Sequence, residues 1–263
     1  MNNNTGRCKP ITKKDAAILT RYFNQRTGGT IYSNYVIGKD GRYRPPDGQI
    51  ALCNMKRRLR DMLVRDTHVF IERPDCYLSI LCQLCTHNAL LFSQELTQPL
   101  FYYRAHPEER HLDIIKHYGV DAVAAKALFT SLLLNQKNAV QRWKKKHRIT
   151  DIYVPMFVRR FERMILEMSC LFIDDDDNRV PISMAIYEVA RDITDLCTAY
   201  CEENGYIYNN YFAACDDGIL IHRRGYRDSL PAELTAFVKE EIDYDILFRE
   251  TLMDQGYELS CAH

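Results

Sequence analysis

Two strand-forming regions lie far apart in this chain, with a long run of helical pattern between them. The first is the apolar stretch His68–Arg73, which Pro74 ends. The second is a pair of apolar stretches, Ile207–Cys215 and Ile219–Arg223, on either side of Asp216-Asp217-Gly218, and Asp and Gly favour tight hairpin turns. These segments do not form a βαβ repeat. The spacing therefore predicts an α+β fold in which a helical insertion interrupts a small sheet.

Apolar residues recur at helical spacing through most of the remaining chain. Thr12 and Ser183 are the expected N-caps of two of these helices, and Gly, Tyr and Pro between Thr27 and Asp47 predict strands and turns. We divide the chain into a basic N-terminal region (1–66), a core (67–103 and 183–263) and a helical insertion (104–182). The predicted helices are Thr12–Asn24, Leu52–Leu63, Tyr77–Phe92, Pro107–His117, Val123–Leu134, Val140–Lys146, Val154–Phe172, Ser183–Cys201 and Glu233–Arg249.

The apolar content is that of a globular protein. No apolar run approaches the ~20 residues of a membrane-spanning helix, and the N-terminal MNNNTGRCKP has no apolar core of a secretion signal. Ten cysteines are many for 263 residues, but most lie within apolar patterns. We therefore expect buried free thiols in an intracellular, reducing compartment, nucleus or cytoplasm, and no membrane partner.

A zinc site is a further interpretation of two of these cysteines. Cys82 and Cys85 have the two-residue spacing of a zinc knuckle, and His87 is close. A second pair at zinc-ribbon spacing is absent, and the surrounding segment has the pattern of a buried helix. We therefore favour buried thiols over zinc.

Charge is unevenly distributed, although 35 Lys and Arg balance 35 Asp and Glu. Residues 1–167 carry 28 basic and 15 acidic side chains, whereas residues 168–263 carry 7 and 20. Basic side chains replace the counterions of a phosphate backbone, and aromatic rings stack on bases. The basic side chains form three clusters along the chain: Lys56-Arg57-Arg58-Leu59-Arg60 with Arg65, then Arg142-Trp143-Lys144-Lys145-Lys146 with Arg148, then Arg159-Arg160 with Arg163. These clusters therefore predict nucleic-acid binding, and we expect DNA. The predicted contacts are Arg57, Arg58, Arg60, Arg142, Trp143, Lys144, Lys145 and Lys146.

Two other interpretations of these charges stay open. The clusters can be solvated helix faces, and the basic and acidic parts can pair with each other or with a second copy of the chain. Nucleic-acid binding should weaken steeply with added salt, whereas a hydrophobic assembly contact should not.

Carboxylates end both strand regions. Asp216 and Asp217 occupy the hairpin turn, where turn chemistry alone explains them equally well. Glu72 and Asp75 follow the first strand, and carboxylates from neighbouring strands are suitable ligands for Mg²⁺. Lys126 lies on a mostly apolar helix, where it either reaches solvent or neutralises a triphosphate.

The order of these elements resembles the palm and fingers module of replication proteins from large DNA viruses and mobile elements, which is similar to family A DNA polymerases. The resemblance covers about residues 40–225 and rests on VFIERPDCYLSIL, VDAVAAKALFTSLLL and YFAACDDGILI. It implies that the core is a polymerase-like palm, a small antiparallel sheet with packed helices, and that the insertion is the fingers.

The first motif of this family is D-x-x-N-x-H-P-x-x-L. Glu72 stands at its metal-binding Asp, and Asp75, Tyr77 and Leu78 stand at the Asn, His and Pro. In the last motif Asp217-Gly218 matches, with Asp216 beside it. The resemblance implies that Glu72, Asp216 and Asp217 hold two Mg²⁺ or Mn²⁺ ions, and that Tyr77 excludes a 2′-hydroxyl.

The fingers motif is R-x-x-x-K-x-x-x-F/L with a later Tyr-Gly. Lys126 matches the Lys that binds the triphosphate, but Ala122 stands at the Arg and Leu134-Asn135 at the Tyr-Gly. Glu188 falls on an acidic position before the hairpin. We assign no role to Glu188 or to the acidic loop 174–177.

Two functions follow. The first is template-directed nucleotidyl transfer to a primer 3′-hydroxyl through two metal ions. The alternative is a non-catalytic nucleic-acid-binding or assembly subunit with a polymerase-like fold, acting with other replication proteins. The surviving Asp216-Asp217 pair favours the first, and the missing Arg and Tyr-Gly favour the second.

Overall fold

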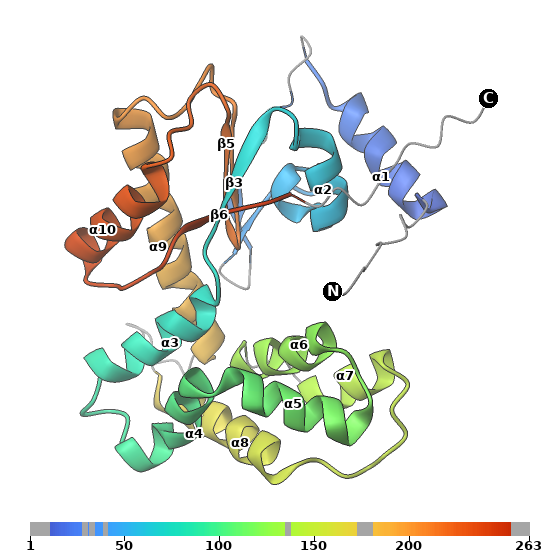
Figure 1. Cartoon of the computed structure of the whole chain (residues 1–263), viewed down its shortest axis with the longest axis vertical. Coiled ribbons are helices and arrows are strands. Elements are labelled where there is room, and N and C mark those ends of the chain that lie inside the picture. Colours follow the sequence, from blue (N-terminus) through green and yellow to red (C-terminus); the bar gives the residue numbers. More distant parts are fainter. Residues whose placement is uncertain are drawn as a thin grey trace, which may run out of the picture. The chain divides into compact units, whose positions relative to one another are not determined.

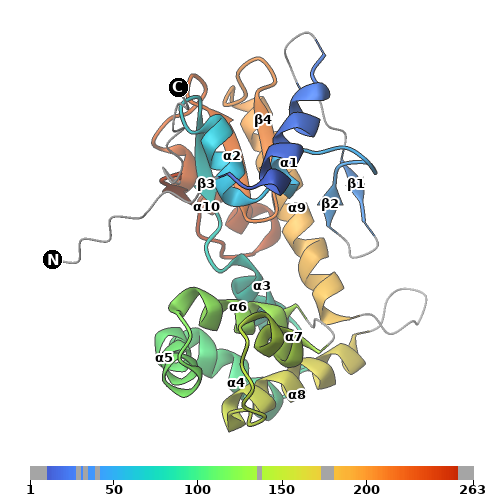
Figure 2. The same cartoon turned by 90° about the vertical axis from the view of Figure 1, so that its right-hand side faces the viewer.

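The computed structural model describes residues 11–27, 31, 35–38, 42–134, 138–172 and 181–253. The chain forms two compact units (Figures 1 and 2). Unit 1 contains Met1–Pro74 and Arg191–His263, and unit 2 contains Asp75–Ala190. Helices and small antiparallel sheets confirm the α+β class. None of the described helices is long and apolar enough to span a membrane.

A four-stranded antiparallel sheet forms the centre of unit 1, with the strand order β4-β5-β3-β6. The register places His68 opposite His222 at one end of the sheet and Glu72 opposite Gly218 at the other. The predicted hairpin is confirmed, with Cys215 paired to Gly218 and the two aspartates forming the turn. The strands are β3 (His68–Glu72), β4 (Phe212–Cys215), β5 (Gly218–His222) and β6 (Arg249–Thr251).

Helices cover both faces of this sheet (Figure 1). Helix α2 (Arg57–Val64) packs on the face that presents Phe70 and Leu220, and α1 (Lys13–Asn24) packs on α2. On the other face lie the part of α9 (Ile182–Glu203) that belongs to unit 1 and α10 (Leu230–Ile242). Short elements complete the unit: β1 (Val36–Ile37), β2 (Tyr43–Arg44) and the 3-10 turn η1 (Leu52–Asn54).

Unit 2 is helical and has its own apolar core. Tyr103 stacks on Phe129 at 4.4 Å between ring centroids, and Phe161 meets Phe129 edge-on at 5.7 Å. These rings are almost entirely buried. Its helices are α3 (Cys76–His87), α4 (Gln94–Ala105), α5 (Pro107–Tyr118), α6 (Ala122–Leu133), α7 (Ala139–Lys146), α8 (Met156–Leu171) and the start of α9.

Several predicted boundaries are wrong. The helix expected at Glu233–Arg249 ends at Ile242, and the following chain becomes β6. The segment expected as one helix over Leu52–Leu63 splits into η1 and α2. Helix α4 was not predicted as a separate element. Ser183 lies inside α9 rather than capping it.

The units also differ from the predicted division of the chain. Helices α3 and α4, expected in the core, belong to unit 2, which begins at Asp75. The N-terminal region belongs to unit 1 because α1, α2 and η1 supply apolar side chains to its core.

Candidate functional site

The predicted carboxylates gather at one end of the sheet in unit 1. Glu72 is the last residue of β3, and its backbone partner is Gly218, which directly follows Asp217. This close packing explains the glycine: a Cβ atom at Gly218 would lie 2.1 Å from the Ile71 carbonyl oxygen. The Arg73 backbone N–H donates to the Asp217 carbonyl at 2.8 Å and fixes the turn against β3. Strand pairing thus brings the predicted acidic positions together.

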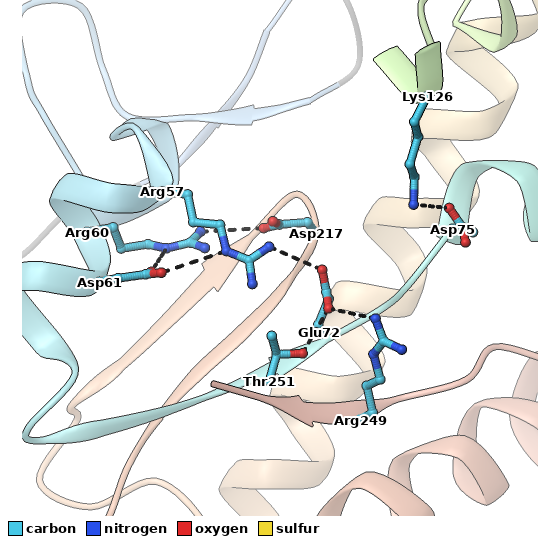
Figure 3. Close-up of polar contacts among 9 residues, drawn as sticks. All are labelled: Arg57, Arg60, Asp61, Glu72, Asp75, Lys126, Asp217, Arg249 and Thr251. Carbon is cyan, nitrogen blue, oxygen red and sulfur yellow. Dashed lines mark hydrogen bonds and ion pairs between the residues drawn. The ribbon is translucent and has the colours of Figure 1, made fainter. Parts of the chain in front are cut away.

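The Glu72 carboxylate is held by three side chains from two elements (Figure 3). Oε1 accepts from Arg57 of α2 at 3.2 Å. Oε2 accepts from the Thr251 hydroxyl at 2.8 Å and from Arg249 at 3.3 Å, both on β6. Partial burial raises the pKa of Glu72, but Thr251, Arg57 and Arg249 outweigh it and lower the pKa below the ordinary value. Glu72 is therefore an ionised, arginine-paired carboxylate at neutral pH.

The two aspartates of the turn also face arginines. Asp217 Oδ1 lies 3.4 Å from Arg60 of α2, and Asp216 Oδ2 lies 3.6 Å from Arg42. Burial raises the pKa of Asp216, the neighbouring Asp217 adds to this, and Arg42 opposes it.

Asp61 connects Arg57 and Arg60 of α2. Its carboxylate lies 3.4 Å from Arg60 and 3.7 Å from Arg57, and it is fully buried. Arg60 is 3% exposed, and its guanidinium lies 4.4 Å from the centre of the Phe70 ring. The result is a continuous network from Asp217 through Arg60, Asp61 and Arg57 to Glu72 (Figure 3).

This network does not fit the predicted two-metal centre. The donor chemistry suits Mg²⁺, which prefers carboxylate oxygens. However, Glu72, Asp216 and Asp217 each face a guanidinium group, and the described residues contain no cluster of three His, Cys, Asp or Glu side chains suited to a metal. As arranged, these carboxylates balance arginine charge, so we assign them no metal-dependent step.

Lys126 and Tyr77, the predicted nucleotide contacts, both lie in unit 2. Lys126 Nζ pairs with Asp75 Oδ1 at 2.7 Å, and both side chains are about half exposed. Tyr77 packs its ring edge-on against Tyr187 at 5.5 Å. The exposed ion pair between Lys126 and Asp75 contributes at most ~1 kcal/mol to stability. The network belongs to unit 1 and the Lys126 pair to unit 2.

The first basic cluster is largely neutralised by acids of unit 1. Arg58 and Lys56 both contact the buried Asp15, at 3.1 and 2.7 Å. Hydrogen bonds from Lys56 and Thr12 hold the pKa of Asp15 well below its usual range. Arg57, Arg58 and Arg60 thus fasten α2 to its neighbours.

The second basic cluster divides into buried and exposed side chains. Trp143 is 4% exposed and its indole N–H donates to the Ala124 carbonyl at 2.7 Å. Lys144 is 9% exposed and donates to the Asp151 carbonyl at 2.8 Å. The polar groups of these two residues, both predicted contacts of nucleic acid, thus bond to backbone carbonyls of unit 2.

The exposed members of this cluster are Arg142, Lys145 and Lys146. In the described ranges they make no ion pair with an acidic side chain. Their charges are therefore available to a partner.

Sequence reasoning missed three contributors to the network, Asp61, Arg249 and Thr251. Asp61 stood within a basic cluster, and Arg249 and Thr251 stood at or beyond the end of a predicted helix. Only the pairing of β6 with β3, which sets Arg249 opposite Glu72, brings the last two to the site.

The remaining predicted residues are Cys82, Cys85, Glu188, Asn135 and the acidic loop 174–177. Cys82 and Cys85 are free and buried in α3, and burial raises the pKa of the two thiols to about 11 and about 12. Glu188 is exposed on α9. The acidic loop 174–177 and Asn135 lie outside the described residues.

Comparisons of this chain with protein-family models, with curated proteins and with solved structures found no match.

Proposed function

We propose that this protein binds nucleic acid without catalysing nucleotidyl transfer, as a binding or assembly subunit with a polymerase-like palm. The observation that carries the proposal is the exposed basic edge of α7, formed by Arg142, Lys145 and Lys146, which lacks acidic partners within the described ranges. Exposed cations on one short helix are suited to contact successive phosphates, because each displaces a condensed counterion.

The arrangement around Glu72 supports the non-catalytic form of this proposal. A polymerase centre needs carboxylates that converge on metal ions. Here the Glu72 and Asp217 carboxylates pair with Arg57 and Arg60, and Asp61 ties those two arginines together. The polymerase-like architecture itself is supported by β3 lying beside the β4–β5 hairpin, with a helical segment between them in sequence.

Nucleotidyl transfer is the second candidate, and one observation favours it. Glu72 stands directly opposite Gly218, so the acidic turn and the acidic strand end are neighbours, as a two-metal centre requires. In this alternative, Mg²⁺ or Mn²⁺ would have to displace Arg57 and Arg60 from the carboxylates.

Salt-dependent binding tests the first proposal. We expect labelled single-stranded DNA to bind the purified protein. The triple variant Arg142→Ala, Lys145→Ala, Lys146→Ala should reduce the slope of log K against log salt by about 2. A matched control removes the same charge from Lys13, Lys14 and Lys239 and should leave the slope nearly unchanged. Equal slopes for the wild type and the α7 variant would contradict the assignment.

Primer extension separates the two candidates. We expect no extension of a labelled primer–template with dNTPs and Mg²⁺ or Mn²⁺, either by the wild type or by Asp217→Asn. Extension by the wild type that the variant abolishes would overturn the non-catalytic proposal and establish Asp217 as a metal ligand.

A further inference from the structure

Unit 1 also contains a cavity that is lined in part by aromatic side chains. This cavity, of about 340 Å³, lies at the end of the sheet away from the acidic turn, where the last turns of α1 and α2 meet the ends of β3 and β4. Helices α1 and α2 cover the face of the sheet that presents Phe70 and Leu220 (Figure 2). Its volume falls at the lower end of the range for small-molecule sites, ~300–1,000 Å³. The lining includes Tyr22, Phe23, Arg26, Thr67, His68 and Tyr211.

Aromatic rings dominate this cavity and remain partly open to solvent. Phe23 and Tyr211 are each 40% exposed. The His222 ring lies 5.6 Å from Tyr211 and 5.3 Å from His68, and Tyr208 stacks on it at 5.1 Å. Partly exposed rings offer a stacking surface to a flat, aromatic ligand.

Among the described residues that line the cavity, Arg26 is the one with a charged side chain. The Arg26 guanidinium is exposed and lies 5.0 Å from the centre of the Phe23 ring. Arg224 donates to the Tyr208 hydroxyl at 2.8 Å, with its guanidinium 5.3 Å from the centre of that ring. None of the described residues that line the cavity is acidic. Burial, together with His222 and Arg223, lowers the pKa of His68 to about 4, so its ring is neutral at pH 7.

We propose that this cavity holds an unstacked base of a single-stranded nucleic acid, stacked on Tyr211, with Arg26 and Arg224 near the adjoining phosphates. The combination of exposed rings with Arg26 at the cavity and Arg224 on the neighbouring Tyr208 carries the assignment, because base stacking and phosphate pairing are the two components of single-strand binding. Paired bases in a duplex already stack on their neighbours, so the cavity should select single strands.

This inference rests on the proposed nucleic-acid binding and deepens it. The test uses fluorescence anisotropy with three probes: a single-stranded oligothymidine, the same strand carrying abasic positions, and a duplex of equal length. We expect the wild type to prefer the intact strand to the abasic strand about tenfold, since stacking contributes ~1–3 kcal/mol per base. Tyr211→Ala should remove that preference and leave duplex binding unchanged.

Two further variants and a folding check make the result specific. Tyr211→Phe keeps the ring and should retain the preference. Phe101→Ala removes a ring of similar exposure, 38%, from unit 2 and should behave as the wild type. Circular dichroism and a thermal melt check that Tyr211→Ala is folded.

The outcomes distinguish the two proposals. If the wild type binds every probe with a salt dependence that the α7 variant reduces, yet shows no preference for bases, the cavity assignment is wrong and the proposed function stands. If the wild type binds none of the probes, both proposals fail. Competition by a mononucleotide at the same concentration as the intact strand would assign the cavity to a free nucleotide and overturn the strand-binding proposal.

Discussion

Gly218 occupies the closest backbone approach around the candidate site. A methyl group there would meet the Ile71 carbonyl oxygen, which strand pairing holds in place. We expect Gly218→Ala to lower the free energy of unfolding by about 3 kcal/mol, as overpacking does. Gly119→Ala is the control, because Gly119 has a positive φ of 68° but open space around it, and should cost only ~1–2 kcal/mol. Urea denaturation measures both, and equal losses would contradict the close contact.

His68 makes the stability of unit 1 sensitive to acid. Its pKa is lowered from 6.5 to about 4 by burial and by the nearby His222 and Arg223, so the unfolded chain binds a proton before the native state does. The stabilising contribution of the neutral His68 ring is complete above pH 6.5 and is lost as the pH falls to about 4. We expect His68→Gln to flatten the decline of unfolding free energy across this window. The exposed His106, replaced by Gln, should leave the decline as in the wild type.

At the scale of elements, α2 is fastened to the sheet by arginines of very different burial. The Arg60 side chain is 3% exposed and contacts Asp61 and Asp217, whereas that of Arg57 is 43% exposed. Removing one partner of a buried pair leaves a charge without water or counterion. Exposed pairs, in contrast, are screened by solvent.

This difference predicts unequal effects of two equivalent substitutions. Arg60→Met should lower the unfolding free energy by about 3 kcal/mol. Arg57→Met should lower it by less than ~1 kcal/mol. Methionine keeps most of the apolar stem in both variants, so the comparison isolates the charge. Denaturant curves for both proteins test the expectation, which equal midpoints would refute.

At the scale of the whole molecule, the two units have separate cores. The largest fully buried side chains of unit 2 include Leu100, Phe129, Phe161 and Ile165, all from helices of that unit. We therefore expect a fragment of residues 75–190 to fold alone, with a helical circular dichroism spectrum and a cooperative thermal transition. A helical spectrum without a cooperative transition would show that unit 2 depends on unit 1.

The sequence by itself determined the elements whose signals are local. Thr12 caps α1 through Asp15, Gly119 ends α5 with a positive φ, and the Asp216-Asp217 turn joins two strands. Each of these outcomes depends on residues a few positions apart, so propensity and hydrogen-bonding chemistry are sufficient to predict them. The meeting of β3 with the hairpin was also predictable, because two apolar strand regions need a common sheet.

Only the tertiary structure decided what the charged residues do. Asp61 lies four residues from Arg57 in sequence, but Arg249 reaches Glu72 through the pairing of β6 with β3. Trp143 and Lys144 stand in the same basic run as Lys145. Trp143 and Lys144 lie on the buried side of α7 and bond to backbone carbonyls, whereas Lys145 is exposed. Whether a charge meets water, an acid or a backbone carbonyl depends on contacts between residues distant in sequence, and no local pattern encodes those contacts.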